Sequence, residues 1–389
     1  MVRDRGFEPL TPSVSRKCST TELTAHANRG RINSQICATW QAQNCLAPRR
    51  QGRRSGERND LKRMPGRVQL SRHSDDSLSM PDSHETSQAF HRSCPLCEQD
   101  DARAFLEKGP LRLRRCRACS MIYADPVEPE LATGKFYDRL GASFYLSPDK
   151  LESDYAPVRF ERELRLFRAH CQSGAVLDVG CSTGAFLYQL RTQFPGAYTV
   201  TGTDVAGAAL DYAESRGLEV IREPFLDVDF GNRRFDAVTF WAVIEHVVQP
   251  RRFLCKAAAI LKPGGHGFIL VPNMKSLAVR LLGAKYRYIM PDHVNYFDAD
   301  TLKRFAAMEP AFEITRFGSS HFNPMVILKD FHGGVERVAD EERARLLKRT
   351  TAYKQLPVLR PVKWVYSGAE RLLGAMGLAD NLFIVLRKK

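Results

Sequence analysis

Long apolar runs, a leader-like start and a dense cysteine framework are all missing from this 389-residue sequence. No uninterrupted apolar stretch approaches the roughly 18 residues that a membrane-spanning helix requires. No positively charged start runs into an apolar segment, so the sequence does not predict a secretory leader. Ten cysteines in a chain of this length do not make a disulfide framework. These absences predict a soluble, cytoplasmic protein with no membrane span.

Acidic residues are also scarce relative to basic ones. The chain has 44 Asp and Glu against 58 Lys and Arg, a formal net charge of +14. Residues 1–80 carry +8 of this excess, and the other 309 residues carry only +6. Basic charge indicates nucleic-acid binding only where it gathers on one face of a folded domain. The charge therefore gives no reason of its own to expect a nucleic-acid partner.

A hydrophobic fraction of 43% is ample for a substantial core.

The first part of the chain differs in character from the rest. Residues 1–80 show no sustained helical or strand periodicity and are rich in Arg, Ser, Gln and Asn. Residues 1–63 resemble the translation of a transfer-RNA gene, most clearly over residues 6–23. We therefore expect residues 1–89 to be a disordered or non-native extension, and we assign it no function.

Beyond a connector and helix expected over residues 127–174, short apolar segments alternate with helical patterns. Strands are expected at residues 175–179, 199–203, 218–221, 235–240 and 267–271. This alternation predicts a parallel sheet with helices on both faces. Ligands of such sheets bind beyond the carboxyl ends of the strands.

The C-terminal part is less regular. Residues 312–317 and 382–386 are expected to form two more strands. An amphipathic helix between them contains Trp364, Tyr366 and Leu372. We expect this helix to pack against the sheet, with a membrane surface as the alternative.

The most informative segment is the glycine-containing turn after the first strand of the sheet. Its glycines, Gly180 and Gly184, would let a ligand approach the backbone closely, and the helix that follows would point free N–H groups at that ligand. Asp204 ends the next strand, 24 residues after Gly180. A carboxylate at that place can accept hydrogen bonds from two ribose hydroxyls.

Three ligand classes compete for this turn. A dinucleotide site needs a glycine where Ser182 stands. The order Gly180-x-Ser182-x-Gly184 also fits a hydrolase nucleophile elbow. However, the Asp and His available downstream, Asp292 and His293, are adjacent in sequence and poorly suited to separate triad roles. S-adenosylmethionine has no phosphate, and its ammonium group suits an acid within the first strand. Asp178 is such an acid, and the third class is therefore favoured.

Residues 170–320 resemble a class I S-adenosylmethionine-dependent methyltransferase. Asp178, Gly180 and Gly184 match its first motif, and Asp204 matches its ribose-binding acid. Phe235–Asp236 opens the fourth strand as in that family, and residues 261–265 match the turn before the fifth. The resemblance implies an α/β fold with a Rossmann-like, mostly parallel seven-stranded sheet with helices on both faces. That methyltransferase domain would span residues 175–389 and use S-adenosylmethionine.

Two histidines are candidates for a general base. His246 follows Glu245 after the fourth strand, where family members often carry a Glu-His pair that borders the donor pocket. Some relatives hold a divalent metal with a second acid three residues earlier, but Ala242 stands there and argues against a metal. His293 lies in a segment that resembles the acceptor side in one branch of the superfamily. We expect His293 as the first candidate base and His246 as the second, with purely structural roles as the alternative.

Four of the cysteines form two pairs: Cys94 with Cys97, and Cys116 with Cys119. Two such C-x-x-C pairs, 18 residues apart, can supply four thiolates to a tetrahedral zinc. Four protein ligands leave no open position, so the zinc would be structural. A redox role is the alternative. Residues 116–126, continuing to Phe136 and Tyr137, also resemble the zinc-ribbon head of some bacterial methyltransferases, several of which act on sugars or other small metabolites. We therefore expect a zinc-ribbon-like module over residues 90–126.

Three functions follow from these patterns. The leading one is transfer of a methyl group to a small-molecule acceptor, such as a sugar-linked or secondary metabolite. The second is an RNA or DNA methyltransferase whose ribbon grips phosphates through the arginines near the cysteine pairs, Arg112, Arg114, Arg115 and Arg117. The third is a non-catalytic binding module.

Overall fold

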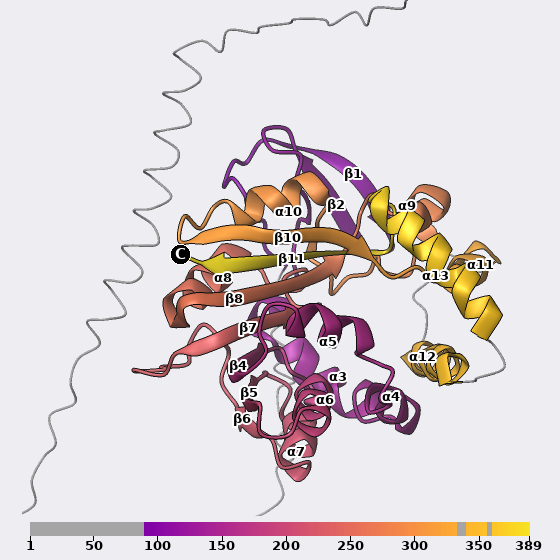
Figure 1. Cartoon of the computed structure of the whole chain (residues 1–389). Helices are drawn as coiled ribbons and strands as arrows, with labels where there is room; N and C mark the ends of the chain where they lie inside the picture. Colours follow the sequence, from indigo (N-terminus) through magenta and orange to yellow (C-terminus); the bar gives the residue numbers. More distant parts are fainter. Residues whose placement is uncertain (1–88, 333–339, 356–359) are drawn as a thin grey trace, which may run out of the picture.

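The computed structural model describes residues 89–389 apart from 333–339 and 356–359 (Figure 1). The extension expected over residues 1–89, with its resemblance to a translated transfer-RNA gene, lies outside the described residues except for Ala89. Across the described ranges, no helix combines the length and apolar content needed to cross a membrane.

The cysteine pairs lie in two turns beside a small antiparallel sheet of four strands, ordered β1-β2-β3-β9. Its strands are β1 (Ala102–Lys108), β2 (Leu111–Cys116), β3 (Ile122–Ala124) and β9 (Asn295–Tyr296). The first three strands belong to the expected ribbon, whereas β9 belongs to the large domain and follows β8 in the chain. The ribbon therefore shares its sheet with the domain that follows it.

Four helices link the two sheets where the sequence predicted a connector and one helix. They are α2 (Pro129–Thr133), α3 (Lys135–Phe144), α4 (Pro148–Asp154) and α5 (Glu161–Arg168). The α5 helix buries Leu164 and Phe167, as their helical spacing predicts. Of the three helices that precede it, α2 and α4 begin at Pro129 and Pro148, which stand in a first helical turn, where a proline costs no hydrogen bond.

The large sheet has seven strands in the order β10-β11-β8-β7-β4-β5-β6. They are β4 (Gly174–Val179), β5 (Tyr198–Thr203), β6 (Glu219–Ile221), β7 (Phe235–Trp241), β8 (Leu261–Pro272), β10 (Phe312–Ser320) and β11 (Asn381–Lys388). The strands from β8 to β6 are parallel, and β11 runs antiparallel to β8 and β10. The predicted mostly parallel, seven-stranded sheet is confirmed.

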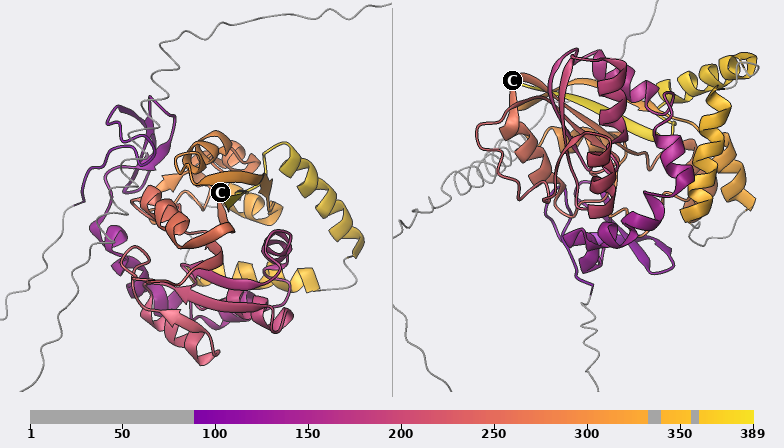
Figure 2. Two further views of the ribbon diagram at one scale, coloured as in Figure 1. Left: turned by 60° about the vertical axis from the view of Figure 1, so that its left-hand side comes forward. Right: turned by 90° about the horizontal axis from the view of Figure 1, so that it is seen from below.

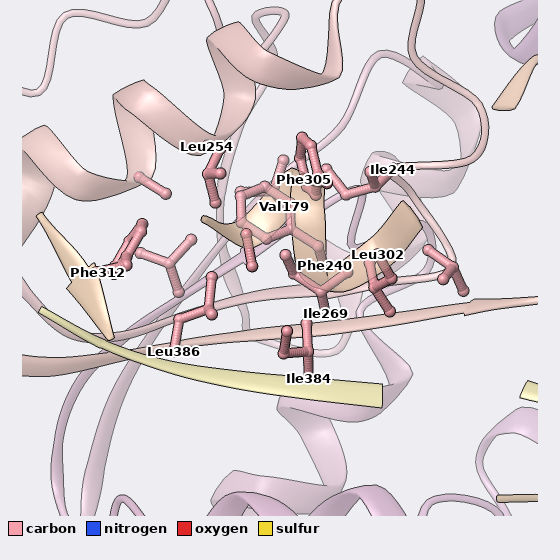
Figure 3. Close-up of a cluster of buried hydrophobic side chains, with 14 of the residues drawn as sticks. Val179, Phe240, Ile244, Leu254, Ile269, Leu302, Phe305, Phe312, Ile384 and Leu386 are labelled. Carbon is pink, nitrogen blue, oxygen red and sulfur yellow. The ribbon is translucent and has the colours of Figure 1, made fainter. Parts of the chain in front are cut away.

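Helices cover both faces of this sheet, as predicted (Figure 1). The remaining helices are α6 (Ala185–Gln193), α7 (Gly207–Ser215), α8 (Pro250–Ile260), α9 (Leu277–Leu282), η1 (Gly283–Lys285), α10 (Ala299–Ala306), α11 (Pro324–His332), α12 (Asp340–Gln355) and α13 (Arg360–Ala375). Buried side chains of α5, α6 and α7 pack on one face with Val176 and Val200 of the strands. Those of α8 and α10 pack on the other with Leu177 and Val238. Figure 3 shows Leu254 of α8 and Leu302 and Phe305 of α10 in this cluster. Adjacent residues of one strand therefore serve opposite layers of the core, as the strand period requires.

The ribbon packs into the second of these layers. Met121 and Tyr123 of the ribbon belong to the same buried cluster as Phe297, Leu302 and Phe305. The backbone N–H of Ala124 also donates to the carbonyl of Val294 at 2.9 Å. The cysteine module is therefore joined to the large domain through its core and through its backbone.

Candidate active site

A cavity of about 1000 Å³ opens beyond the carboxyl ends of β4, β5 and β7. This is the edge where the strand order reverses, because β4 pairs with β5 on one side and with β7 on the other. Ligands of open α/β sheets bind at such a point. Of the five predicted donor-binding residues, Asp178, Gly180 and Asp204 line the cavity and Gly184 stands at the start of α6. The fifth, Glu245, is not among the residues that line the cavity.

Asp178 is 3% exposed at the end of β4 and lines the cavity. Its Oδ1 accepts a hydrogen bond of 2.6 Å from the hydroxyl of Thr239 on β7. Burial raises the pKa of Asp178 to about 7, and the hydroxyl only partly opposes this shift. A cation placed in the cavity would restore the ionised carboxylate, which is the property an ammonium-binding acid needs.

Every second residue of the glycine turn has a positive φ: Gly180 at 72°, Ser182 at 51° and Gly184 at 74°. A Cβ on Gly180 would lie 2.6 Å from Val243, and one on Gly184 would lie 2.3 Å from Leu218. Both glycines are therefore required by close contacts as well as by backbone conformation. The turn delivers the chain into α6, whose N-cap is Gly184.

Asp204 ties this turn to the end of β5. Its Oδ2 accepts from the backbone N–H of Ser182 at 2.7 Å, and its Oδ1 accepts from those of Val205 and Ala206 at 2.7 and 3.0 Å. The carboxylate lines the cavity, and a carboxylate has about four acceptor sites. One acceptor site remains after three backbone N–H groups have donated, so Asp204 can both hold the turn and accept a hydrogen bond from a ligand hydroxyl.

Several cavity residues escaped the sequence-based prediction. Phe225, Leu226 and Asp227 follow β6 and line the cavity beside Asp204. The segment that holds them carries no motif, and only its position after the third parallel strand could have indicated it. Side chains from the connector and from α12, including Phe144 and Leu347, also line the cavity. Both lie outside the strands and turns that the motifs mark.

His246 lines the cavity, and its hydrogen bonds fix its tautomer. Its Nδ1 lies 2.8 Å from the carbonyl oxygen of Asp292 and 2.8 Å from the hydroxyl of Tyr137. A carbonyl oxygen can only accept a hydrogen bond, so Nδ1 of His246 carries the hydrogen. The Tyr137 hydroxyl donates to the same carbonyl oxygen, which lies 3.3 Å away. Burial lowers the pKa of His246. The neutral ring therefore keeps its lone pair on Nε2.

His293 lies behind His246 and is not among the residues that line the cavity. It is 5% exposed, its ring meets that of His246 edge-on with centroids 4.6 Å apart, and its Nδ1 has no hydrogen-bond partner among the described residues. Burial lowers its pKa well below the usual value. The structure thus places the second candidate base, His246, nearer to the cavity than the first.

Glu245 points away from solvent toward these histidines. It is 1% exposed, burial raises its pKa to about 8, and neither carboxylate oxygen has a hydrogen-bond partner within the described ranges. One ligand atom each from Glu245, His246 and His293 lies within 4.8 Å of the others. One carboxylate and two imidazoles are ligands that a divalent transition metal accepts. A metal would therefore need no acid at Ala242, because His293, which is distant in sequence, offers a third ligand atom.

The four cysteines of the ribbon meet at one point, with one ligand atom of each within 4.8 Å of the others. The Sγ atoms of Cys94 and Cys119 are 3.5 Å apart, as are those of Cys97 and Cys116. Sulfurs about 2.3 Å from a tetrahedral zinc would be spaced similarly. The residue after each pair, Glu98 or Ser120, has a positive φ and donates its N–H back to the first cysteine's carbonyl. All four thiols are free, and the set fits a zinc ion.

Comparison with known proteins supports the interpretation of the cavity. The family described as "Methyltransferase domain" matches residues 154–308. A ubiquinone biosynthesis O-methyltransferase of Caulobacter vibrioides is 31% identical over 186 residues, which cover 44% of this chain and 72% of the relative. The enzyme of that name from Vibrio parahaemolyticus is 32% identical over 196 residues, 45% of this chain and 81% of the relative. The leading functional prediction, a methyltransferase for a small molecule, is confirmed.

Solved structures give a weaker likeness. A methyltransferase of Thermotoga maritima, described as a possible histamine N-methyltransferase, superposes with a TM-score of 0.41 at 17% identity, covering 67% of this chain and 98% of that one. The extent and identity of the sequence matches carry the assignment instead. The chain belongs to the family of S-adenosylmethionine-dependent methyltransferases.

Proposed function

We propose that the enzyme methylates a hydroxyl oxygen of a small acceptor bound beside His246. The observation that carries this proposal is the neutral His246 ring, whose Nδ1–H is committed to the Asp292 carbonyl at 2.8 Å. The opposite nitrogen is then free to receive a proton. The name of the two relatives above, ubiquinone biosynthesis O-methyltransferase, supports oxygen as the methylated atom.

The donor occupies the end of the cavity formed by the glycine turn. Asp178 would hold the ammonium group, and the remaining acceptor site of Asp204 would accept from one ribose hydroxyl. The adenine lies against the segment after β6, where Phe225 and Leu226 offer apolar contacts and Asp227 an acceptor. When bound, S-adenosylmethionine supplies a methyl group on a positively charged sulfur, which any aligned nucleophile can displace.

At the acceptor end, His246 removes the proton from the acceptor hydroxyl as the oxygen bonds to the methyl carbon. The carbon–sulfur bond breaks, its electron pair stays on sulfur, and the proton remains on Nε2 until it passes to solvent. Tyr137 and the Asp292 carbonyl keep the ring oriented during this transfer. His293 packs behind the ring and supports it. A metal held by Glu245, His246 and His293 would instead lower the pKa of the acceptor hydroxyl.

The cysteine module holds a structural zinc in this proposal. Its sulfur spacing supports the assignment, and the four thiolates would complete the metal's coordination. A sugar-linked or secondary metabolite stays our prediction for the acceptor.

Two measurements test the proposal. Calorimetry with the purified chain should detect S-adenosylmethionine binding that Asp204→Ala weakens strongly. Asp211→Asn, a change to an exposed acid of α7 that forms an ion pair with Arg222, should leave binding unaltered. Mass spectrometry of metabolite extracts incubated with donor should show a gain of one methylene on a hydroxyl compound. Wild-type donor binding with methylation of amines alone would contradict the oxygen assignment.

A further inference from the structure

Exposed apolar side chains are concentrated at one end of the molecule. The described residues include eleven large hydrophobic side chains that are exposed, and eight of them lie on α9, α11 and α13 or just after α13. These eight are Leu281 of α9, Met325, Leu328 and Phe331 of α11, Trp364, Val365 and Leu372 of α13, and Met376 just after it. Figures 1 and 2 show the three helices gathered at the same end. We call this set the apolar face.

The α13 helix is held by its other side. Glu370, which is 6% exposed, forms an ion pair with Arg162 of α5, and the hydroxyl of Tyr366 donates to the carbonyl of Phe322. Gly374 lets the helix approach β10, since a Cβ there would lie 2.7 Å from the carbonyl oxygen of Ser319. The predicted packing against the sheet therefore involves the polar side of α13, and Trp364 remains 83% exposed.

The exposed charged side chains on the elements that carry the apolar face all have one sign, whereas the neighbouring α12 also carries exposed acids. On the described side chains of α9, η1, α11 and α13, the exposed charged groups are Arg280, Lys285, Lys329 and Arg371. The acids of the same elements, Asp330 and Glu370, are buried against Arg287 and Arg162. Lys329 is the one of the four that the structure pairs with a carboxylate, Glu342 of α12.

This charge pattern discriminates between possible occupants. In a two-fold contact between copies of the chain, the same surface meets itself, so unpaired cations would face cations. An anionic bilayer offers the opposite charge together with an apolar interior for the ring and aliphatic groups. Tryptophan and flanking Lys and Arg are the side chains that favour the boundary between headgroups and acyl chains.

The apolar face also borders the cavity. Val326 of α11 lines the cavity, whereas its neighbours Met325 and Leu328 are exposed on the apolar face. Tyr288, just after η1, lines the cavity and is itself 38% exposed. One helix thus separates the cavity from the apolar face.

We propose that α9, α11 and α13 dock the enzyme on an anionic lipid bilayer, with the apolar side chains inserted at the headgroup level and the cations paired with lipid phosphates. The docking requires no methyl transfer, so it can fail or hold independently of the proposed function. It places the cavity next to the bilayer, where an acceptor with an apolar tail could enter past α11.

Sedimentation with vesicles tests the docking, using the full chain. We expect binding to phosphatidylcholine vesicles containing one quarter phosphatidylglycerol, weaker binding at high salt, and little binding to phosphatidylcholine alone. The double variant Trp364→Ser with Leu372→Ser should lower the partition coefficient at least about tenfold. Lys285→Gln with Arg371→Gln should lower it about thirtyfold, from about 1 kcal/mol for each basic residue at such a surface.

Controls separate docking from misfolding and self-association. Phe105→Ser removes an exposed ring from β1 of the ribbon and should leave vesicle binding unaltered. Because the substituted side chains are exposed, circular dichroism and donor binding should match the wild type for every variant. Absence of binding to anionic vesicles, or equal loss in the Phe105 variant, would overturn the proposal. A concentration-dependent dimer that the Trp364 and Leu372 changes dissolve would overturn it in favour of a second copy.

Discussion

The protonation of Asp178 should make donor affinity depend on pH. Its carboxyl is buried, and its pKa in the free enzyme is raised to about 7. Only the ionised form attracts the donor's ammonium group, so binding favours proton release from Asp178. The apparent dissociation constant is the intrinsic one divided by the ionised fraction. Since that fraction rises from about 0.03 at about pH 5.5 to about 0.5 at about pH 7, affinity should increase about fifteenfold over this interval.

Calorimetry at several pH values measures this directly. The donor's α-amino group stays charged throughout the interval, because such groups titrate near about pH 8. Asp178→Asn should bind the donor more weakly at pH 7 and should lose most of the pH dependence. Repeating the titration in buffers of different ionisation enthalpy should reveal proton release only in the wild type. An affinity that does not change with pH, or an equal slope in Asp178→Asn, would refute the reasoning.

The other predictions concern the base, the turn and the cysteines. His246→Gln should lower kcat about 10² to 10⁴-fold, while Tyr137→Phe should lower kcat only several-fold, both with little effect on donor affinity in calorimetry. Unchanged turnover in the His246 variant would assign the base elsewhere. Gly184→Ala should destabilise the fold by at least about 1–3 kcal/mol in urea unfolding, because a left-handed residue would also contact Leu218; a stabilised variant would contradict this. Metal analysis should find zinc at one ion per chain, and Cys119→Ser should lose it along with several degrees of melting temperature.

The sequence was most informative where a short segment carries its own constraints. The glycine turn combines positive-φ residues with close contacts. Asp178 and Asp204 lie beside it because β4 and β5, which are consecutive in the chain, are also neighbours in the sheet. The paired cysteines likewise belong to two tight turns whose geometry is local. For these features, the spacing of residues along the chain determines their spacing in the fold.

Sequence reasoning failed where contacts join distant segments. Nothing in the sequence near His293 shows that its ring packs behind His246, because 46 residues separate them and the alignment depends on the loop after β8. The α12 side chains at the cavity come from beyond β10 and carry no motif. Amphipathicity identified the α13 helix but not which side faces the sheet, because Gly374 and Glu370 decided the packing rather than Trp364.

The two-residue strand β9 has a consequence for how the enzyme can be divided. Asn295 of β9 accepts from Arg92 of the ribbon segment at 2.6 Å and donates to the carbonyls of Ile244 and Val247, on either side of the Glu-His pair. Removing the ribbon would remove the hydrogen bond from Arg92 that holds Asn295 against the segment containing His246. The glycine turn and Asp204 would still be supported by the large sheet. A truncated catalytic domain should therefore still recognise the donor but hold His246 less firmly, so the cysteine head supports the wall of the cavity and is not a detachable accessory.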